Sequence, residues 1–411
     1  MLGFSSSERQ VRPAAQFFIP AILALLAPFA AAAEPAAADC TAPPTAALTA
    51  SLPAHPFAAI ASADGCSIFV SLITPGRDNH GDVVLLRRDG DKLEAVRGVP
   101  LRGEPAILAL THDEKLLIAA DAHDVAFLDP QILASGAGDA VLGYLDEGGE
   151  GVIGVAVSPD DGTLFVSDER SATLTVVDLA KARAGGFGAD AVIGKIPVGR
   201  APVGLALSPD GRLLYSTSEV APPGAGWPVA CPRESGGDTT PVNPRGALIV
   251  VDVARARADP SGAILARVPA GCNAVRVVLS PAGDRAYVTA RGSNEVLVFD
   301  TAKLVSDPGA ARLASVPTGN SPVGLAVTPD GARLIVTNSN RFARDRDASE
   351  ALSVIDTAKV DGGAAAVLGT IAVGAFPREL RMAPGGVLLV TNFLSNTLQL
   401  IPLDTSPPPK N

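Results

Sequence analysis

The chain has 411 residues, of which 47% are hydrophobic and 18% are charged, and its formal net charge is −10. This composition supports a large apolar core and excludes an intrinsically disordered chain. The acidic balance provides no basic surface for duplex nucleic acid or an anionic membrane, so we expect neither as a partner. The 41 Gly and 35 Pro are typical of many short strands joined by turns.

Residues 1–33 have the features of an export signal. Arg9 and Arg12 precede an apolar run at residues 17–29, and the small residues that follow suit cleavage after Ala33. The run is too short to span a bilayer, and a short membrane anchor is the alternative interpretation. We expect a mature chain without a transmembrane segment, located in the periplasm or outside the cell.

Four cysteines follow this segment, and an even number in an exported chain favours disulfides. Three pairings are possible. We predict Cys40–Cys66 and Cys231–Cys272, because each of these pairs closes a local segment. The C-x-x-C spacing typical of zinc sites does not occur and the chain has only four His, so we expect no cofactor.

One phrase recurs along the rest of the chain: an alternating apolar run, a Ser/Thr-Pro-Asp-Gly turn and a second apolar run. Clear copies lie at residues 154–168, 204–218, 276–290, 324–338 and 380–392, and degenerate copies lie at 59–72 and 108–121. The third turn position falls at Asp64, Asp113, Asp160, Asp210, Ala282, Asp330 and Gly385, with spacings of 49, 47, 50, 72, 48 and 55 residues. A period near 50 residues with strand-length runs indicates a β-propeller rather than a helical solenoid.

Each copy continues with a third strand that ends in Asp and a fourth strand that leads into a Pro or Gly turn, which gives four antiparallel strands per blade. The seventh copy ends after its third strand, at residues 398–404. Residues 47–53 have the layout of a fourth strand, and we predict that they close the ring by pairing with residues 398–404. The predicted fold is an all-β, seven-bladed β-propeller over residues 44–405, with a short segment at 34–43 before it and a tail at 406–411 after it.

The second run of the phrase resembles the motif of the YVTN-repeat β-propellers, a group that shades into the lactonase-like propellers. It reads YVTA at 287–290, IVTN at 335–338 and LVTN at 389–392, with YSTS at 215–218 and FVSD at 165–168 as looser copies. The resemblance covers residues 44–405 and implies a seven-bladed ring that is often exported in bacteria. It implies no catalytic residues, because the motif is a structural strand that ends in a polar residue.

The two faces of such a ring differ in their chemistry. One face holds the Pro-Asp-Gly turns, and we expect a structural role for the aspartates there and at the ends of the third strands. The other face holds the loops between second and third strands. Three of these loops are enlarged, at residues 74–82, 219–246 and 339–350. We predict that this face binds a small anionic ligand or a protein segment.

Charged residues interrupt the small residues of the first strands, which line the axis. Arg276 and Glu379 stand where other copies have Gly, and Arg381 stands where they have Ala. One interpretation is a Glu379–arginine pair that plugs the channel, because charges are seldom buried unpaired. The other is an anion subsite of Arg276, Arg378 and Arg381. The predicted ligand-binding set is Arg276, Asn338, Arg341, Arg378, Glu379 and Arg381.

Two weaker candidate sites lie in the first two copies. His55 and Glu104 occupy equivalent positions at the channel mouth and are candidates for acid–base catalysis. The nearby loops hold candidate metal ligands without any motif spacing, namely His80, Asp82, Asp121 and His123.

The sequence favours a monomeric binding or scaffold protein over an enzyme. It contains no phosphate-binding glycine loop, no G-x-S-x-G elbow and no C-x-x-C-H haem site. Two alternatives stay open. One is a lactonase-like hydrolase or lyase for a small cyclic ester or sugar-acid ligand, which rests on fold analogy and the charged channel. The other is a structural or assembly protein of the cell envelope.

Overall fold

The computed structural model describes residues 40–74, 76, 80–228, 230–231, 244–341 and 350–403. All of them belong to one compact unit, Ala38–Asn411. The predicted signal segment 1–33, most of the segment 34–43 and the tail 406–411 lie outside the described residues. Within the described ranges, no helix is long and apolar enough to cross a membrane.

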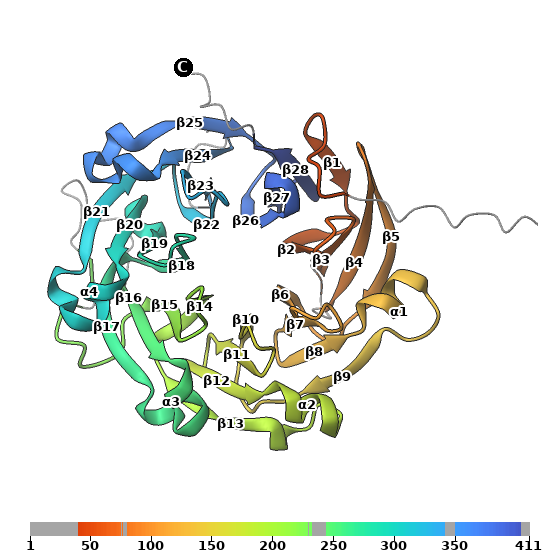
Figure 1. The fold of residues 1–411 in the computed structure, drawn as a ribbon, viewed down its shortest axis with the longest axis horizontal. Coiled ribbons are helices and arrows are strands. Elements are labelled where there is room, and N and C mark those ends of the chain that lie inside the picture. Colours follow the sequence, from red (N-terminus) through yellow and green to blue (C-terminus); the bar gives the residue numbers. More distant parts are fainter. Residues whose placement is uncertain are drawn as a thin grey trace, which may run out of the picture. The chain divides into compact units, whose positions relative to one another are not determined.

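The predicted seven-bladed β-propeller is confirmed. In the described part of the chain, seven sheets of four antiparallel strands surround a central axis (Figure 1). Each sheet is one blade, its first strand lies nearest the axis, and the blades follow one another around the ring in chain order.

The strands of the first three blades are β2 (His55–Ala61), β3 (Ser67–Thr74), β4 (His80–Asp89) and β5 (Lys92–Pro100), then β6 (Pro105–Leu110), β7 (Leu117–Asp121), β8 (Asp124–Leu128) and β9 (Val141–Leu145), then β10 (Val152–Val157), β11 (Thr163–Asp168), β12 (Thr173–Asp178) and β13 (Val192–Pro197). Blades four and five are β14 (Arg200–Leu207), β15 (Leu213–Val220), β16 (Arg245–Asp252) and β17 (Ile264–Cys272), then β18 (Ala274–Leu279), β19 (Arg285–Ala290), β20 (Glu295–Asp300) and β21 (Arg312–Pro317). Blade six is β22 (Pro322–Val327), β23 (Arg333–Asn338), β24 (Ala351–Asp356) and β25 (Val367–Ala372), and blade seven is β26 (Pro377–Ala383), β27 (Val387–Asn392), β28 (Thr397–Pro402) and β1 (Leu48–Ser51).

The Ser/Thr-Pro-Asp-Gly turns join the first strand of a blade to the second. In blade four, Ser208 Oγ donates to Asp210 Oδ1 (2.5 Å), which also accepts the Arg212 N–H (3.1 Å). Gly211 closes the turn with a φ of 69°, a conformation that disfavours a side chain. Equivalent bonds occur in blades three and six, so these aspartates have the structural role that the sequence predicted.

The third strands lead into short helices, which the strand pattern did not predict. In α2, the Asp178 carboxylate accepts the Lys181 N–H (2.9 Å), so the aspartate that ends the strand is also the N-cap of the helix. The helices are α1 (Pro130–Ser135), α2 (Leu179–Gly185), α3 (Val253–Ala258) and α4 (Thr301–Ser306), and the 3₁₀ turns are η1 (Ala189–Ala191), η2 (Pro260–Gly262), η3 (Arg291–Ser293), η4 (Pro308–Ala310), η5 (Thr357–Ala366) and η6 (Pro384–Gly386).

Buried hydroxyls tie five of the blades to the next blade. Thr217 on β15 accepts the Gly204 N–H of its own blade (3.0 Å) and donates to the Val275 carbonyl of the following blade (2.7 Å). A Cβ on Gly204 would lie 2.7 Å from the same carbonyl oxygen. In blade four the close approach of the next blade therefore leaves no room for a side chain at Gly204, whereas the equivalent positions of blades five and seven hold Arg276 and Glu379. These bridging hydroxyls belong to Ser71, Thr217, Thr289, Thr337 and Thr391.

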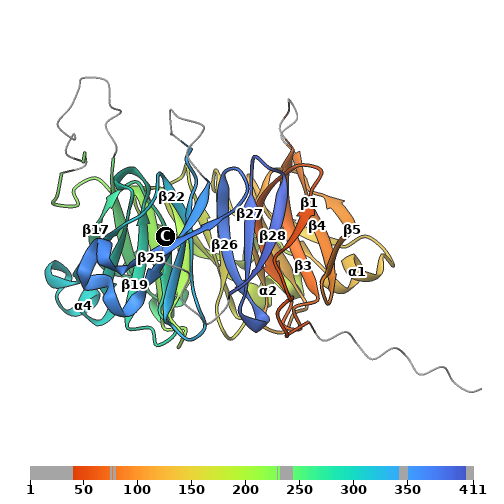
Figure 2. The same cartoon turned by 90° about the horizontal axis from the view of Figure 1, so that it is seen from above.

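The ring has two distinct faces (Figure 2). The loops between second and third strands and the connections between blades lie on one side, called here the loop face. The Pro-Asp-Gly turns and the helices lie on the other, called the turn face. The enlarged loops predicted at 74–82, 219–246 and 339–350 lie partly outside the described residues.

The N-terminal strand closes the ring. β1 pairs antiparallel with β28, with Leu48 opposite Leu400 and Ser51 opposite Thr397. Ala50 and Leu400 are buried in a shared apolar cluster, so the closing strand also completes a core. The predicted pairing of the two chain ends is thus present.

Both predicted disulfides are present. Cys40 pairs with Cys66 with a Cα–Cα distance of 5.1 Å, and Cys231 pairs with Cys272 at 6.0 Å. The first attaches the segment before β1 to blade one, and the second joins the long loop of blade four to the end of β17.

Removing the closing strand should open the ring. We expect deletion of residues 34–54 to give an aggregating product, because β28 would then present unpaired N–H and C=O groups at a sheet edge. The deletion also removes Cys40, so the matched control is the full chain with Cys40→Ser and Cys66→Ser, compared with the deletion carrying Cys66→Ser. Light scattering and the melting temperature check the result, and an unchanged melting temperature in the deleted protein would contradict it.

Candidate functional site

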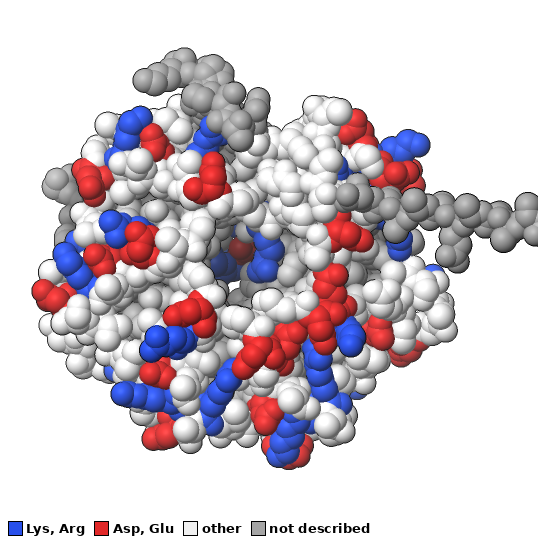
Figure 3. Space-filling model, viewed as in Figure 1, with Lys and Arg blue, Asp and Glu red and all other residues white. Residues whose placement is uncertain are grey.

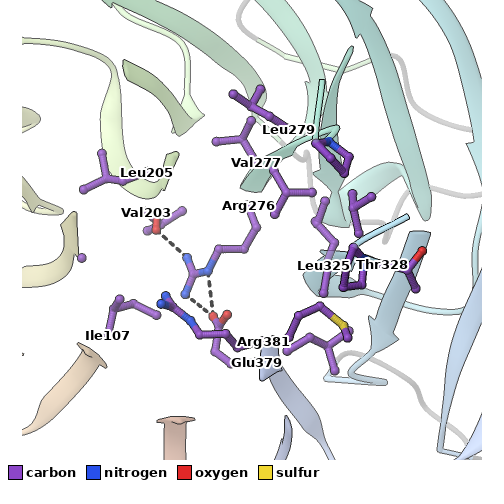
Figure 4. Close-up of a pocket in the computed structure, with 18 of the residues that line it drawn as sticks. Ile107, Val203, Leu205, Arg276, Val277, Leu279, Leu325, Thr328, Glu379 and Arg381 are labelled. Atoms are coloured by element: carbon purple, nitrogen blue, oxygen red, sulfur yellow. Dashed lines mark hydrogen bonds and ion pairs between the residues drawn. The ribbon is translucent and has the colours of Figure 1, made fainter. Parts of the chain in front are cut away.

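An ion pair lies across the inside of the ring. Arg276 lies on β18 of blade five and Glu379 on β26 of blade seven. Arg276 Nε donates to Glu379 Oε1 (2.7 Å) (Figure 4). Arg276 Nη1 also donates to the Val203 carbonyl (2.6 Å). The two side chains are only 12% and 11% exposed. Arg276 is therefore the arginine that neutralises Glu379.

The bridging hydroxyls position this pair. The Arg276 N–H donates to Thr289 Oγ1 (3.0 Å), and the Glu379 N–H donates to Thr391 Oγ1 (3.1 Å). Each of these first strands shifts register at the same place. Such an irregularity re-aims a side chain relative to a regular strand, and the hydroxyl holds it there.

A small cavity of about 70 Å³ adjoins the pair on the loop face. Its charged lining comes from the first strands and from the segments that follow the second strands, because both meet at this end of the axis. The charged residues are Arg276, Arg291, Arg341, Arg378, Glu169 and Glu219. Four guanidinium groups thus surround a space with room for about two water molecules.

Arg378 has the least compensated charge in this group. Its guanidinium lies over the ring of Phe57 (3.7 Å to the centroid) and near Phe393 (5.2 Å). Among the described residues it has no hydrogen bond or ion pair, and its Nε is buried without a partner. Burial lowers the pKa of Arg378 to about 9; Glu379 opposes this shift and the neighbouring arginines add to it. An anion placed here would therefore be stabilised by an unusually available cation.

Arg291 is paired, in contrast. Its Nη2 lies 2.6 Å from Glu219 Oε2, and the two side chains are 11% and 16% exposed. Burial lowers the pKa of Arg291, and Glu219 opposes that shift. Glu169 is exposed at the rim of the cavity.

Sequence reasoning missed Arg291, Glu219 and Glu169. Each directly follows the four-residue motif of its copy, after YVTA, YSTS and FVSD respectively. A comparison of that single position between the copies would have found all three, because the end of every second strand points to the loop face.

His55 and Glu104 are not brought together. His55 Nδ1 lies 2.8 Å from the Phe393 carbonyl oxygen and 2.5 Å from Asn396 Oδ1, and its ring stacks on Phe393. Within the described ranges, no hydrogen bond or ion pair joins the two residues. The histidine instead holds the loop between β27 and β28 of blade seven against the start of blade one.

Asn338 and Arg381 lie away from the loop-face cavity. Asn338 is buried, accepts the Gly319 N–H (3.0 Å) and donates to Ser353 Oγ (3.0 Å). Arg381 lines the channel on the turn side of the ion pair. Of the predicted binding set, Arg276, Arg341 and Arg378 meet around this cavity.

The candidate metal ligands do not form a cluster. In the part of the chain that the structure describes, no group of three or more His, Cys, Asp or Glu is arranged to hold a metal ion. His80 and His123 are exposed, whereas Asp121 is buried. Asp121 Oδ2 accepts the Gly103 N–H (3.0 Å), and its Oδ1 has no partner.

The ion pair at the axis should contribute to stability. Arg276→Met leaves Glu379 largely buried without its partner and should lower the free energy of unfolding by about 3–5 kcal/mol. Adding Glu379→Gln should restore much of that loss. Denaturant unfolding checks both, with Arg312→Met as the control because Arg312 is exposed on β21. Equal stability of Arg276→Met and the wild type would contradict this account of the pair.

Asp121 should destabilise the folded protein above pH 6. Burial raises its pKa to about 6, with Asp124 adding to the shift and Gly103 and His123 opposing it. Because the folded pKa lies above the unfolded value of about 3.9, this contribution is unfavourable above pH 6 and is relieved as the pH falls towards 4. Asp121→Asn should therefore raise the free energy of unfolding by up to about 2–3 kcal/mol at pH 7.5 and by little at pH 4.

Urea unfolding at the two pH values measures this difference. The control is Asp210→Asn, because the Ser208 hydroxyl lowers the pKa of Asp210, so that removing this carboxylate should destabilise the protein at pH 7.5. A stability difference for Asp121→Asn that does not change with pH would contradict the assignment.

Many solved structures are similar to this chain, two of them as follows. A hydrazine synthase chain from Kuenenia stuttgartiensis has a TM-score of 0.63 and 18% identity, covering 87% of this chain and 98% of that chain. A periplasmic gluconolactonase from Pseudomonas aeruginosa has a TM-score of 0.56 and 21% identity, covering 79% of this chain and 86% of that chain. No protein-family model and no curated protein matches the sequence. These similarities establish the fold alone, and the YVTN-repeat resemblance stays a prediction.

Proposed function

We propose that this chain is an exported binding protein that takes a carboxylate or phosphate group into the loop-face cavity. The observation that carries the proposal is the Arg378 guanidinium, which has no hydrogen bond or ion pair among the described residues. The ring of Phe57 stacks against the face of this guanidinium. The N–H edge of Arg378 therefore stays available for a bidentate contact with an anion. Arg341 lines the same cavity and adds positive charge.

The size of the cavity sets the kind of ligand. A volume of about 70 Å³ suits one anionic group, so the rest of the ligand lies outside, among the loops of the same face. A small sugar acid or an acidic side chain of a partner protein fits this description. The two disulfides support an oxidising compartment, either the periplasm or the exterior of the cell.

The lactonase-like alternative has less support from the site. Fold similarity to a gluconolactonase does not transfer its activity. The acid–base candidates His55 and Glu104 are not joined, and the His55 Nδ1 atom already contacts Phe393 and Asn396. A role in envelope assembly has no observation of its own.

Calorimetric titration at low salt with inorganic phosphate and with gluconate tests the proposal. We expect both anions to bind, and Arg378→Met to weaken their binding about tenfold or more, because a charge-assisted hydrogen bond is lost while stacking on Phe57 is kept. Arg341→Met should weaken binding as well, and Arg312→Met should not.

Two results would contradict this function. One is the absence of binding of either anion to the wild type, and the other is unchanged binding by Arg378→Met. Hydrolysis of gluconolactone by the wild type above the buffer rate would favour the lactonase-like alternative instead.

A further inference from the structure

A second and larger cavity lies on the turn side of the Arg276–Glu379 pair. Its volume is about 470 Å³, within the range of about 300–1,000 Å³ for sites that bind small molecules. Figure 3 shows the ring hollowed at its centre, with charged atoms inside the hollow and acidic groups near the lower side of its opening. The cavity shares only Val203 and Arg276 with the loop-face cavity.

The walls of this cavity combine aliphatic side chains with the polar groups of Arg276, Glu379, Arg381 and Thr328. The aliphatic side chains belong to the first strands, and Pro281 and Pro329 of the turns lie towards the opening. Representative wall residues are Ile107, Val155, Leu205, Val277, Leu279 and Leu325. The aliphatic part of this lining favours an apolar segment of a ligand over water.

The guanidinium group of Arg381 lies in the lining of this cavity. Arg381 lies beside the ion pair in Figure 4, but the dashed contacts join only Arg276 with Glu379 and Val203. In the described ranges, Arg381 has no hydrogen bond or ion pair, and its side chain is open to solvent within the channel. A bound anion would therefore give this guanidinium a counter-charge that the described residues do not provide.

The charge balance along the axis points the same way. Of the three guanidinium groups along the axis, those of Arg276, Arg378 and Arg381, only that of Arg276 pairs with the Glu379 carboxylate within the described ranges. One uncompensated cation therefore remains on each side of the pair, Arg378 on the loop side and Arg381 on the turn side.

We propose that the turn-face cavity binds an amphipathic carboxylate, with its head group on Arg381 and its aliphatic tail along the aliphatic part of the walls. A small inorganic anion would leave that part in contact with water. An uncharged aliphatic molecule would leave Arg381 without a counter-charge. Only a ligand with both parts satisfies the whole cavity. The site is independent of the loop-face function.

Titration calorimetry of the full chain with acetate, octanoate, decanoate and 1-octanol tests this site. Octanoate should bind much more tightly than acetate, which lacks the tail, and than 1-octanol, which lacks the charge. Between octanoate and decanoate the affinity should rise about fourfold for each added methylene. Equal affinities for octanoate and 1-octanol would overturn the assignment of the head group, and absence of octanoate and decanoate binding would overturn the site.

Variants of Arg381 locate the head group. Arg381→Met should weaken decanoate binding about tenfold or more, while the melting temperature stays unchanged because no hydrogen bond is lost. Arg381→Lys should keep part of the affinity and provides the measurement if the Met variant folds poorly. Arg312→Met is the matched control. Unchanged decanoate binding in the Arg381 variants, or displacement of decanoate by inorganic phosphate, would overturn the proposal.

Discussion

The hydroxyl that bridges one blade to the next is the contact on which the rest of this ring depends. Each bridging hydroxyl is buried and bonds both the first strand of its own blade and the first strand of the following blade, as Thr217 does. A buried polar atom is favourable only when its hydrogen bonds are made, so the spacing between the two strands is narrowly set. In blade four a Cβ on Gly204 would lie only 2.7 Å from the Val275 carbonyl oxygen. The bridging hydroxyls also fix the backbone of Arg276 and Glu379, through Thr289 and Thr391.

Much of the fold could be predicted because its determinants are local and repeated. The sequence alone reveals the Pro-Asp-Gly turns, the alternation of apolar and polar residues in the strands, and the number of copies. The incomplete last copy indicated that β1 closes the ring. The short helices were missed because Asp178 and its equivalents look alike as strand ends and as N-caps. The partners of His55 were missed for another reason. They lie 338 and 341 residues away along the chain and become neighbours only when the ring closes.

The candidate site was predictable only in part, because its charges come from several blades. Arg276, Glu379 and Arg381 were recognised as charges where other copies have Gly or Ala. The pairing of Arg291 with Glu219 depends on the curvature that brings the ends of β19 and β15 together, and no local pattern encodes it. The charges along the axis depend both on the local sequence repeat and on the geometry of the ring. A departure from the repeat marks which blades carry charge, and the ring geometry decides that Glu379 pairs with Arg276.

The join between β1 and β28 has a consequence for how the protein is made. Six blades consist of strands that are consecutive in the chain, so each can pair its own strands as soon as it has been synthesised. The seventh cannot, because β1 is synthesised first and its partner β28 is synthesised last, so that Leu48 can pair with Leu400 only at the end of synthesis. Contacts this distant in sequence form late and slowly. Until the last strand arrives, the chain remains an open arc with an unpaired strand at its beginning.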